Sequence, residues 1–158
     1  MRALLYGTAA LLLCVTAWSI KQGFAHGADT KLQITGDGTD LLTFEGAEIK
    51  MLVDQSVLPE GEVEIGILYL PVGYDSSGEH QHGSTEVFYV MEGRLIHRLN
   101  GEVHILEPGT IGIVRKGDEI DHGVDGDVPV KALVVWVPGG EVDRLIDIGF
   151  ESTPLDKD

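Results

Sequence analysis

The sequence has few basic residues. Its 158 residues include 11 Lys and Arg against 26 Asp and Glu, which gives a formal net charge of −15. A protein that binds the nucleic-acid backbone needs a basic stripe to displace counterions, so this composition excludes a general nucleic-acid binder. The same shortage of cations argues against docking on an anionic membrane surface.

Cysteine is nearly absent as well. Cys14, the one cysteine of the chain, lies in an apolar stretch near the N-terminus. Beyond that stretch, cysteine is excluded as nucleophile and as metal ligand, so those roles fall to His, Asp and Glu. The sequence also lacks a G-x-S-x-G motif, an internal repeat and any helical periodicity longer than two turns after residue 25.

Residues 1–25 read as an export signal. Arg2 is followed by a nearly continuous apolar run, and Gly23 and Ala25 place small residues before a cleavage point. Removing this segment takes away two basic residues and no acid, which leaves a net charge of −17. We expect a periplasmic or secreted protein with no membrane contact. The alternative is an uncleaved segment that anchors the chain, although the run is short for a spanning helix.

The rest of the chain predicts an all-β fold. The chain has 21 glycines, 19 of them after residue 25, which favour many tight turns, and short runs of β-branched and aromatic residues recur between them. Asn100-Gly101 is the strongest hairpin signal. We expect N-terminal strands within 26–60, a sandwich or small barrel over 61–150 with a short helical turn near its C-terminal end, and a flexible tail at 151–158.

Histidines supply the candidate chemistry. His80 and His82 are two residues apart, so on a strand their side chains point to one face. A turn brings Glu86 near them, and His122 is the best candidate for a fourth donor. Such nitrogen and oxygen donors suit one divalent transition metal: Mn, Fe, Zn, Ni or Cu. The alternative is a pair of solvated histidines on a loop.

The wider pattern around these residues is more specific. Residues 80–93 read H-Q-H-G-S-T-E-V-F-Y-V-M-E-G, which resembles the first motif of the cupin superfamily. In that motif His-x-His is followed by Glu and then, after six residues, by Gly, as His80, His82, Glu86 and Gly93 are here. The second cupin motif is only partly present, because Arg115 stands where the family usually has Pro and His122 comes two residues late.

The resemblance covers about residues 60–138 and implies a jelly-roll β-barrel with a metal inside it. It also implies that His80, His82, Glu86 and His122 are the metal ligands. Cupins of this size include dioxygenases, isomerases, decarboxylases and lyases, so the resemblance implies no single reaction. A homodimer is expected by analogy with cupins that pair through their sheets.

Four further side chains are candidates for substrate contact. Phe88 shares the strand face of Glu86, and His97 faces inward if its leucine neighbours do. Tyr69 belongs to the alternating face of Val63, Ile65 and Ile67. Each of these three has ordinary strand or core packing as its alternative. Arg115 is a candidate for compensating an anionic substrate, and its alternative is an exposed ion pair with nearby acids.

Two classes of function follow from the sequence. The first is a metal-dependent enzyme acting on a small oxygenated molecule. The second is a non-catalytic module that binds a small ligand or stores metal. The sequence favours the first and identifies neither the metal nor the reaction.

Overall fold

The computed structural model describes residues 37–76 and 78–155. This part of the chain belongs to one compact unit, which spans 32–158. The described residues form one helix, α1 (Glu141–Asp147), and eleven strands. The strands are β1 (Asp40–Phe44), β2 (Ala47–Val53), β3 (Glu64–Leu70), β4 (His80–Gln81), β5 (Thr85–Glu92), β6 (Leu95–Leu99), β7 (Glu102–Leu106), β8 (Ile111–Val114), β9 (Glu119–Val124), β10 (Val130–Val137) and β11 (Glu151–Pro154).

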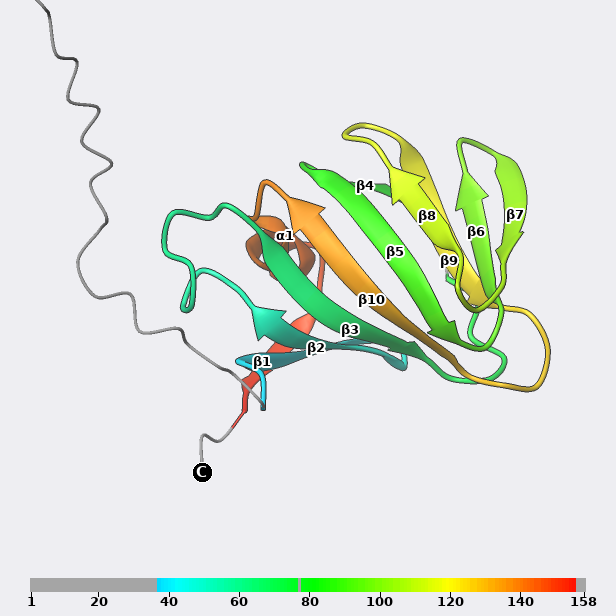
Figure 1. Cartoon of the computed structure of the whole chain (residues 1–158), viewed down its shortest axis with the longest axis horizontal. Coiled ribbons are helices and arrows are strands. Elements are labelled where there is room, and N and C mark those ends of the chain that lie inside the picture. The colour runs from blue at the N-terminus through cyan, green and yellow to red at the C-terminus, as the bar shows by residue number, and fades with distance from the viewer. Residues whose placement is uncertain (1–36, 77, 156–158) are drawn as a thin grey trace, which may run out of the picture. The chain divides into compact units, whose positions relative to one another are not determined.

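Two antiparallel sheets make up the fold. The larger has seven strands in the order β11-β1-β2-β3-β10-β5-β8, and the smaller has four in the order β4-β9-β6-β7 (Figure 1). Among the described residues no strand pairing joins the two sheets into a closed barrel. The all-β prediction is confirmed, and neighbouring strands in the order are often distant in sequence, as in a jelly roll.

Tight turns form where the sequence offers residues that accept positive φ. Asn100 and Gly101 have φ values of 51° and 79° and connect β6 to β7, as predicted. Glu45 and Gly46, at 48° and 93°, connect β1 to β2 in the same way. Both φ angles are positive in each pair, which is the geometry that matches the twist of a two-residue hairpin.

The predicted inner face of β3 is wrong. The sequence indicated Val63, Ile65, Ile67 and Tyr69 as one face, but the buried side chains of β3 are those of Glu64, Leu68 and Leu70. Gly66 completes the inner face, because Ile49 packs where a Cβ would stand. Both faces of this central strand carry apolar residues, so alternation alone did not indicate which one faces the core.

The C-terminal region is more ordered than expected. The predicted helical turn is present as α1, and it packs Leu145 into the core. Glu151–Pro154, predicted to belong to a flexible tail, instead form strand β11, which pairs with β1 at the edge of the large sheet. Phe150 stacks on Phe44 with ring centroids 5.0 Å apart, and this contact holds β11 to β1.

The strands predicted within 26–60 are β1 and β2. They continue the sheet of β3 rather than forming a separate layer. The proposed export signal, residues 1–25, lies outside the described residues. In the part of the chain that is described, no helix has the length and apolar character needed to cross a membrane.

Candidate functional site

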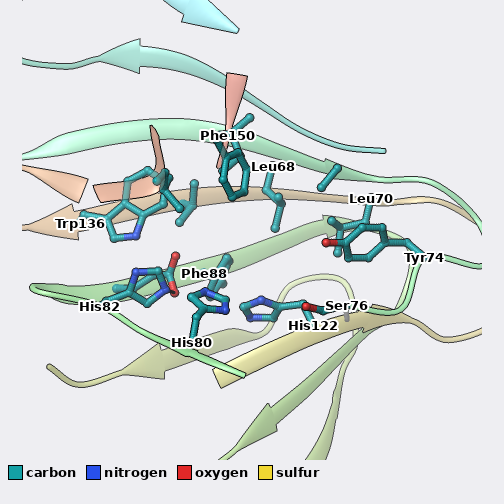
Figure 2. Close-up of a pocket in the computed structure, with 15 residues that line it drawn as sticks. Leu68, Leu70, Tyr74, Ser76, His80, His82, Phe88, His122, Trp136 and Phe150 are labelled. Atoms are coloured by element: carbon teal, nitrogen blue, oxygen red, sulfur yellow. Dashed lines mark ion pairs between the residues drawn. The ribbon is translucent and has the colours of Figure 1, made fainter. Parts of the chain in front are cut away.

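A cavity of about 60 Å³ lies between the two sheets. The large sheet supplies most of its wall, including Leu68, Phe88 and Trp136, while the small sheet supplies His80 and His122 (Figure 2). Leu145 of α1 also lines the cavity. Most of the lining is apolar, and the polar side chains that line it are those of Tyr74, Ser76, His80, His82, Glu86 and His122.

The four predicted metal ligands all line this cavity. His80 is the first residue of β4, which pairs with β9, and His122 lies on β9 itself. Glu86 is the second residue of β5 on the opposite sheet, and His82 lies on the connection between β4 and β5. The ring centroid of His80 is 4.8 Å from that of His82 and 6.3 Å from that of His122. The structure therefore brings the four side chains together.

His82 lies between two carboxylates. Its Nε2 atom is 2.9 Å from Oε2 of Glu86, and its Nδ1 atom is 3.1 Å from Oε2 of Glu141. All three side chains are about 3% exposed. Burial by itself lowers the pKa of His82, but the contacts with Glu141 and Glu86 outweigh it and raise that pKa to about 9. Burial also raises the pKa of Glu86.

The other histidines of the site are neutral near pH 7. Burial, followed by the neighbouring His82, lowers the pKa of His80 to about 4. Burial also lowers the pKa of His97 to about 4 and that of His122 well below 6.5. A neutral imidazole keeps one nitrogen lone pair for a ligand, so this environment favours metal binding over protonation.

Of the candidate substrate-contact residues, Phe88 reaches the cavity and His97 does not. Phe88 is buried and lines the cavity, with its ring edge-on to His122 at a centroid distance of 4.7 Å. His97 is buried but lies outside the lining, with Nδ1 3.3 Å from Nε2 of His122. It therefore contacts a candidate ligand rather than the cavity.

Tyr69 and Arg115 do not belong to the site. Tyr69 is 39% exposed on the outer face of the large sheet, because β3 has the opposite orientation to the one predicted. Arg115 is exposed at the end of β8, on the face of Ile111 and Ile113, which is the outer face of the sheet. Neither side chain is among those that line the cavity.

Glu141 is a buried contact of His82 that sequence reasoning missed. It lies 59 positions after His82, and the sequence indicated only that a helical turn begins there. No local pattern marks an acidic residue at the start of a short helix as buried, because the helix position depends on tertiary packing. Tyr74 and Ser76, on the loop before β4, also line the cavity, and no local sequence pattern indicated it.

The nitrogen and oxygen atoms of these side chains are of the types that bind divalent metals, but the side chains are not arranged around a single ion position. Nε2 of His82 and Oε2 of Glu86 are both buried and have no hydrogen-bond partner besides each other. Their separation of 2.9 Å is that of an N–H···O hydrogen bond, so a proton joins them in the absence of a metal. Within 37–76 and 78–155, however, no group of three or more His, Cys, Asp or Glu side chains is arranged to hold a metal ion.

Known proteins resemble the chain in sequence and in fold. Residues 66–136 match the family model described as "Cupin domain". No curated protein matches the sequence significantly. An RmlC-like cupin from Shewanella frigidimarina is 18% identical, with a TM-score of 0.56 over 68% of this chain and 91% of that one.

Two further solved structures share the fold. KdgF from a Halomonas species is 17% identical, with a TM-score of 0.54 over 64% of this chain and 88% of its own. A predicted oxalate decarboxylase from Thermotoga maritima is 19% identical, with a TM-score of 0.54 over 67% of this chain and 96% of its own.

The fold and the cavity define a mostly β protein with antiparallel jelly-roll sheets and histidines between them. Residues 66–136 match the cupin domain family, and the fold of the chain is shared with solved cupin structures. At these identities the solved structures establish the fold alone.

Proposed function

We propose that this protein binds one divalent transition metal (Mn, Fe, Zn, Ni or Cu) through His80, His82, Glu86 and His122. The observation that carries this proposal is the buried pair of candidate metal-binding atoms, Nε2 of His82 and Oε2 of Glu86, which lie 2.9 Å apart and have no hydrogen-bond partner besides each other. Two buried acceptors at that distance need a cation between them, either a proton or a metal ion. The neutral neighbours His80 and His122 line the same cavity and complete the proposed set.

The proposed activity is that of an enzyme on a small oxygenated molecule, of the dioxygenase, isomerase, decarboxylase or lyase type. When bound, the metal would act as a Lewis acid toward a substrate oxygen. The chain itself supplies an apolar wall, with Phe88 and Trp136, that orients the carbon skeleton and limits water. The hydroxyl-bearing residues Tyr74 and Ser76 line the cavity beside His122 and offer hydrogen bonds to further substrate oxygens (Figure 2).

The lining also bears on the charge of the substrate. No Lys or Arg is among the described residues that line the cavity, and Arg115 lies outside it. A small dianion would therefore meet no Lys or Arg there, and its only positive partner would be protonated His82 or the bound metal. Although one structural neighbour is a predicted oxalate decarboxylase, these features favour an uncharged substrate with an apolar part and one or two oxygens.

A second candidate function is that of a non-catalytic binding module. The predominance of apolar lining residues favours it, because such a cavity holds a ligand without needing any reactive group. Oxygen consumption and product formation, measured with a panel of diols and enols on metal-loaded protein, separate the two. Turnover supports the enzyme, whereas tight binding without turnover supports the module.

Elemental analysis tests the metal proposal. The protein is purified from its own compartment as the wild type and as His82→Ala, with His104→Ala as the matched control on exposed strand β7. We expect about one equivalent of metal in the wild type and in the control, and a loss of that equivalent in His82→Ala. Equal metal content in all three proteins contradicts the proposal.

Export and pairing are also proposed. The signal-like character of residues 1–25 supports a periplasmic or secreted protein. N-terminal sequencing tests this, with His26 as the expected first residue and Met1 as the contradicting result. The apolar outer face of the large sheet supports a homodimer.

A further inference from the structure

Glu141 makes an unusually complete set of contacts for a buried acid. Its side chain is about 3% exposed at the start of α1. Oε1 accepts hydrogen bonds from the backbone N–H of Gly83 at 2.6 Å and from the hydroxyl of Ser84 at 2.9 Å. Oε2 lies 3.1 Å from Nδ1 of His82. The carboxylate therefore binds three consecutive residues, 82–84, between β4 and β5.

A second buried acid fixes the position of Glu141. Oε2 of Glu64, on β3, accepts hydrogen bonds from the backbone N–H groups of Glu141 at 2.8 Å and Val142 at 3.0 Å. These are the first two N–H groups of α1, which have no partner within the helix. Gly140, the residue before the helix, offers no side-chain cap. Glu64 thus ties the start of α1 to the large sheet, and Glu141 is held with it.

The contact with Glu141 determines which nitrogen of His82 carries hydrogen. An ionised carboxylate only accepts hydrogen bonds, so Nδ1 of His82 must be the donor. In a neutral ring the hydrogen is then on Nδ1, and the lone pair is on Nε2. Nε2 is the buried atom that lies 2.9 Å from Oε2 of Glu86 and has no other hydrogen-bond partner.

We propose that Glu141 is a positioning residue, which holds His82 in the tautomer that presents Nε2 to the metal. The inference rests on the proposed function, since it assumes that His82 is a ligand. Carboxylates that accept a hydrogen bond from a ligating histidine orient the ring and raise its basicity. Here the carboxylate comes from the C-terminal helix, outside the strands that supply the ligands.

Glu141→Gln is the sharpest test. The amide oxygen of Gln still accepts from Gly83 and Ser84, while its NH₂ group faces Nδ1 of His82 and favours hydrogen on Nε2. The measurement is the Zn²⁺ dissociation constant of the full chain, obtained by competition with a chelating dye. We expect about 10- to 100-fold weaker binding in the variant. Asp143→Asn, the same change of carboxylate to amide on the exposed side of α1, is the matched control and should bind Zn²⁺ like the wild type.

Nitrogen NMR provides a readout that does not depend on metal. Spectra of the metal-free protein are recorded above the pKa of about 9 of His82, where its ring is neutral. We expect the hydrogen on Nδ1 in the wild type and in Asp143→Asn, and on Nε2 in Glu141→Gln. Hydrogen on the same nitrogen in all three proteins would overturn the inference, as would equal Zn²⁺ affinity in the wild type and Glu141→Gln.

The two proposals fail in different ways. If the wild type binds no Zn²⁺, the metal site is contradicted, while the NMR spectra still decide the role of Glu141. If Glu141→Gln does not fold, Glu141→Asp replaces it, because it keeps the charge but is one methylene shorter and pulls back from Nδ1. A folded Asp variant with weakened Zn²⁺ binding supports the inference, and one with wild-type binding and wild-type His82 spectra overturns it.

Discussion

Nδ1 of His97 lies 3.3 Å from Nε2 of His122, and the two residues are directly opposite each other on β6 and β9. Burial lowers the pKa of both, so both are neutral near pH 7. One ring therefore donates a hydrogen and the other accepts it, which fixes the orientation of His122 at the cavity wall. Protonation of both rings would remove the acceptor and place two like charges in contact.

Acid is expected to destabilise the metal-free protein below pH 6.5. His80 and His97 have native pKa values of about 4, below the ordinary 6.5. Between these values the unfolded chain binds more protons than the folded one, so the stability that these residues contribute is lost as the pH falls from 6.5 to 4. Urea unfolding at a series of pH values checks this, and constant stability across that window would contradict it.

Base is expected to destabilise the metal-free protein as well. The pKa of His82 is raised to about 9, so its contribution is complete below pH 6.5 and is lost as the pH rises through 9. His82→Gln should remove this alkaline loss and keep the acidic one. The same unfolding series measures both, and an unchanged alkaline loss in His82→Gln would show that another group causes it.

Metal binding is expected to release a proton. At neutral pH the metal-free protein holds a proton on His82, and a metal at Nε2 must replace it. About one proton per ion should therefore leave the protein, because metal ligands bind in their deprotonated form. Calorimetric titration with Zn²⁺ in two buffers of different ionisation enthalpy counts the protons. Binding heats that do not depend on the buffer would contradict this.

Gly93, the last residue of the cupin-like motif, should tolerate no side chain. Its φ is +72°, and a Cβ there would lie 2.4 Å from the backbone oxygen of Pro129. We expect Gly93→Ala to cost about 2–5 kcal/mol, from left-handed strain and overpacking together. Gly117→Ala is the control, because φ is +86° but nothing lies within 4 Å of the added Cβ. The control should lose about 1–2 kcal/mol in denaturant unfolding, and equal losses would be inconsistent with this packing.

The outer face of the large sheet is expected to pair two copies of the chain. Tyr89 on β5 is 45% exposed and lies opposite Leu133 on β10 and Ile111 on β8, which is 59% exposed. Contiguous apolar surface of this kind is typical of an interface. Light scattering should give the mass of a dimer for the wild type and of a monomer for Tyr89→Glu. Val103→Glu, on exposed β7 of the other sheet, should remain a dimer, and a monomeric wild type would contradict the proposal.

Local sequence signals predicted much of the fold and the composition of the site. The Asn100-Gly101 turn depends on two adjacent residues, and its prediction is confirmed. His80, His82 and Glu86 are close in sequence, so their common position at the cavity depends on one short connection between β4 and β5. His122 also reaches the cavity, although its spacing departs from the family motif.

Features that depend on contacts between distant segments were not predictable. Tyr69 and Arg115 lie on the outer face of the large sheet. Both faces of this sheet carry apolar residues, so the alternation of apolar and polar positions did not indicate which face is buried. Glu141 contacts His82 only because α1 folds back against the sheet, where Glu64 binds its first N–H groups. Glu151–Pro154 has little strand propensity, and it is ordered by its pairing with β1.

Anomalous X-ray diffraction tests the central claim most directly. The crystals are grown from natively purified protein, and data are recorded on both sides of the absorption edge of the metal found by elemental analysis. We predict one anomalous peak in the cavity, within bonding distance of His80, His82, Glu86 and His122. Clear density for these four side chains without a peak between them, or a peak bound elsewhere, would contradict it.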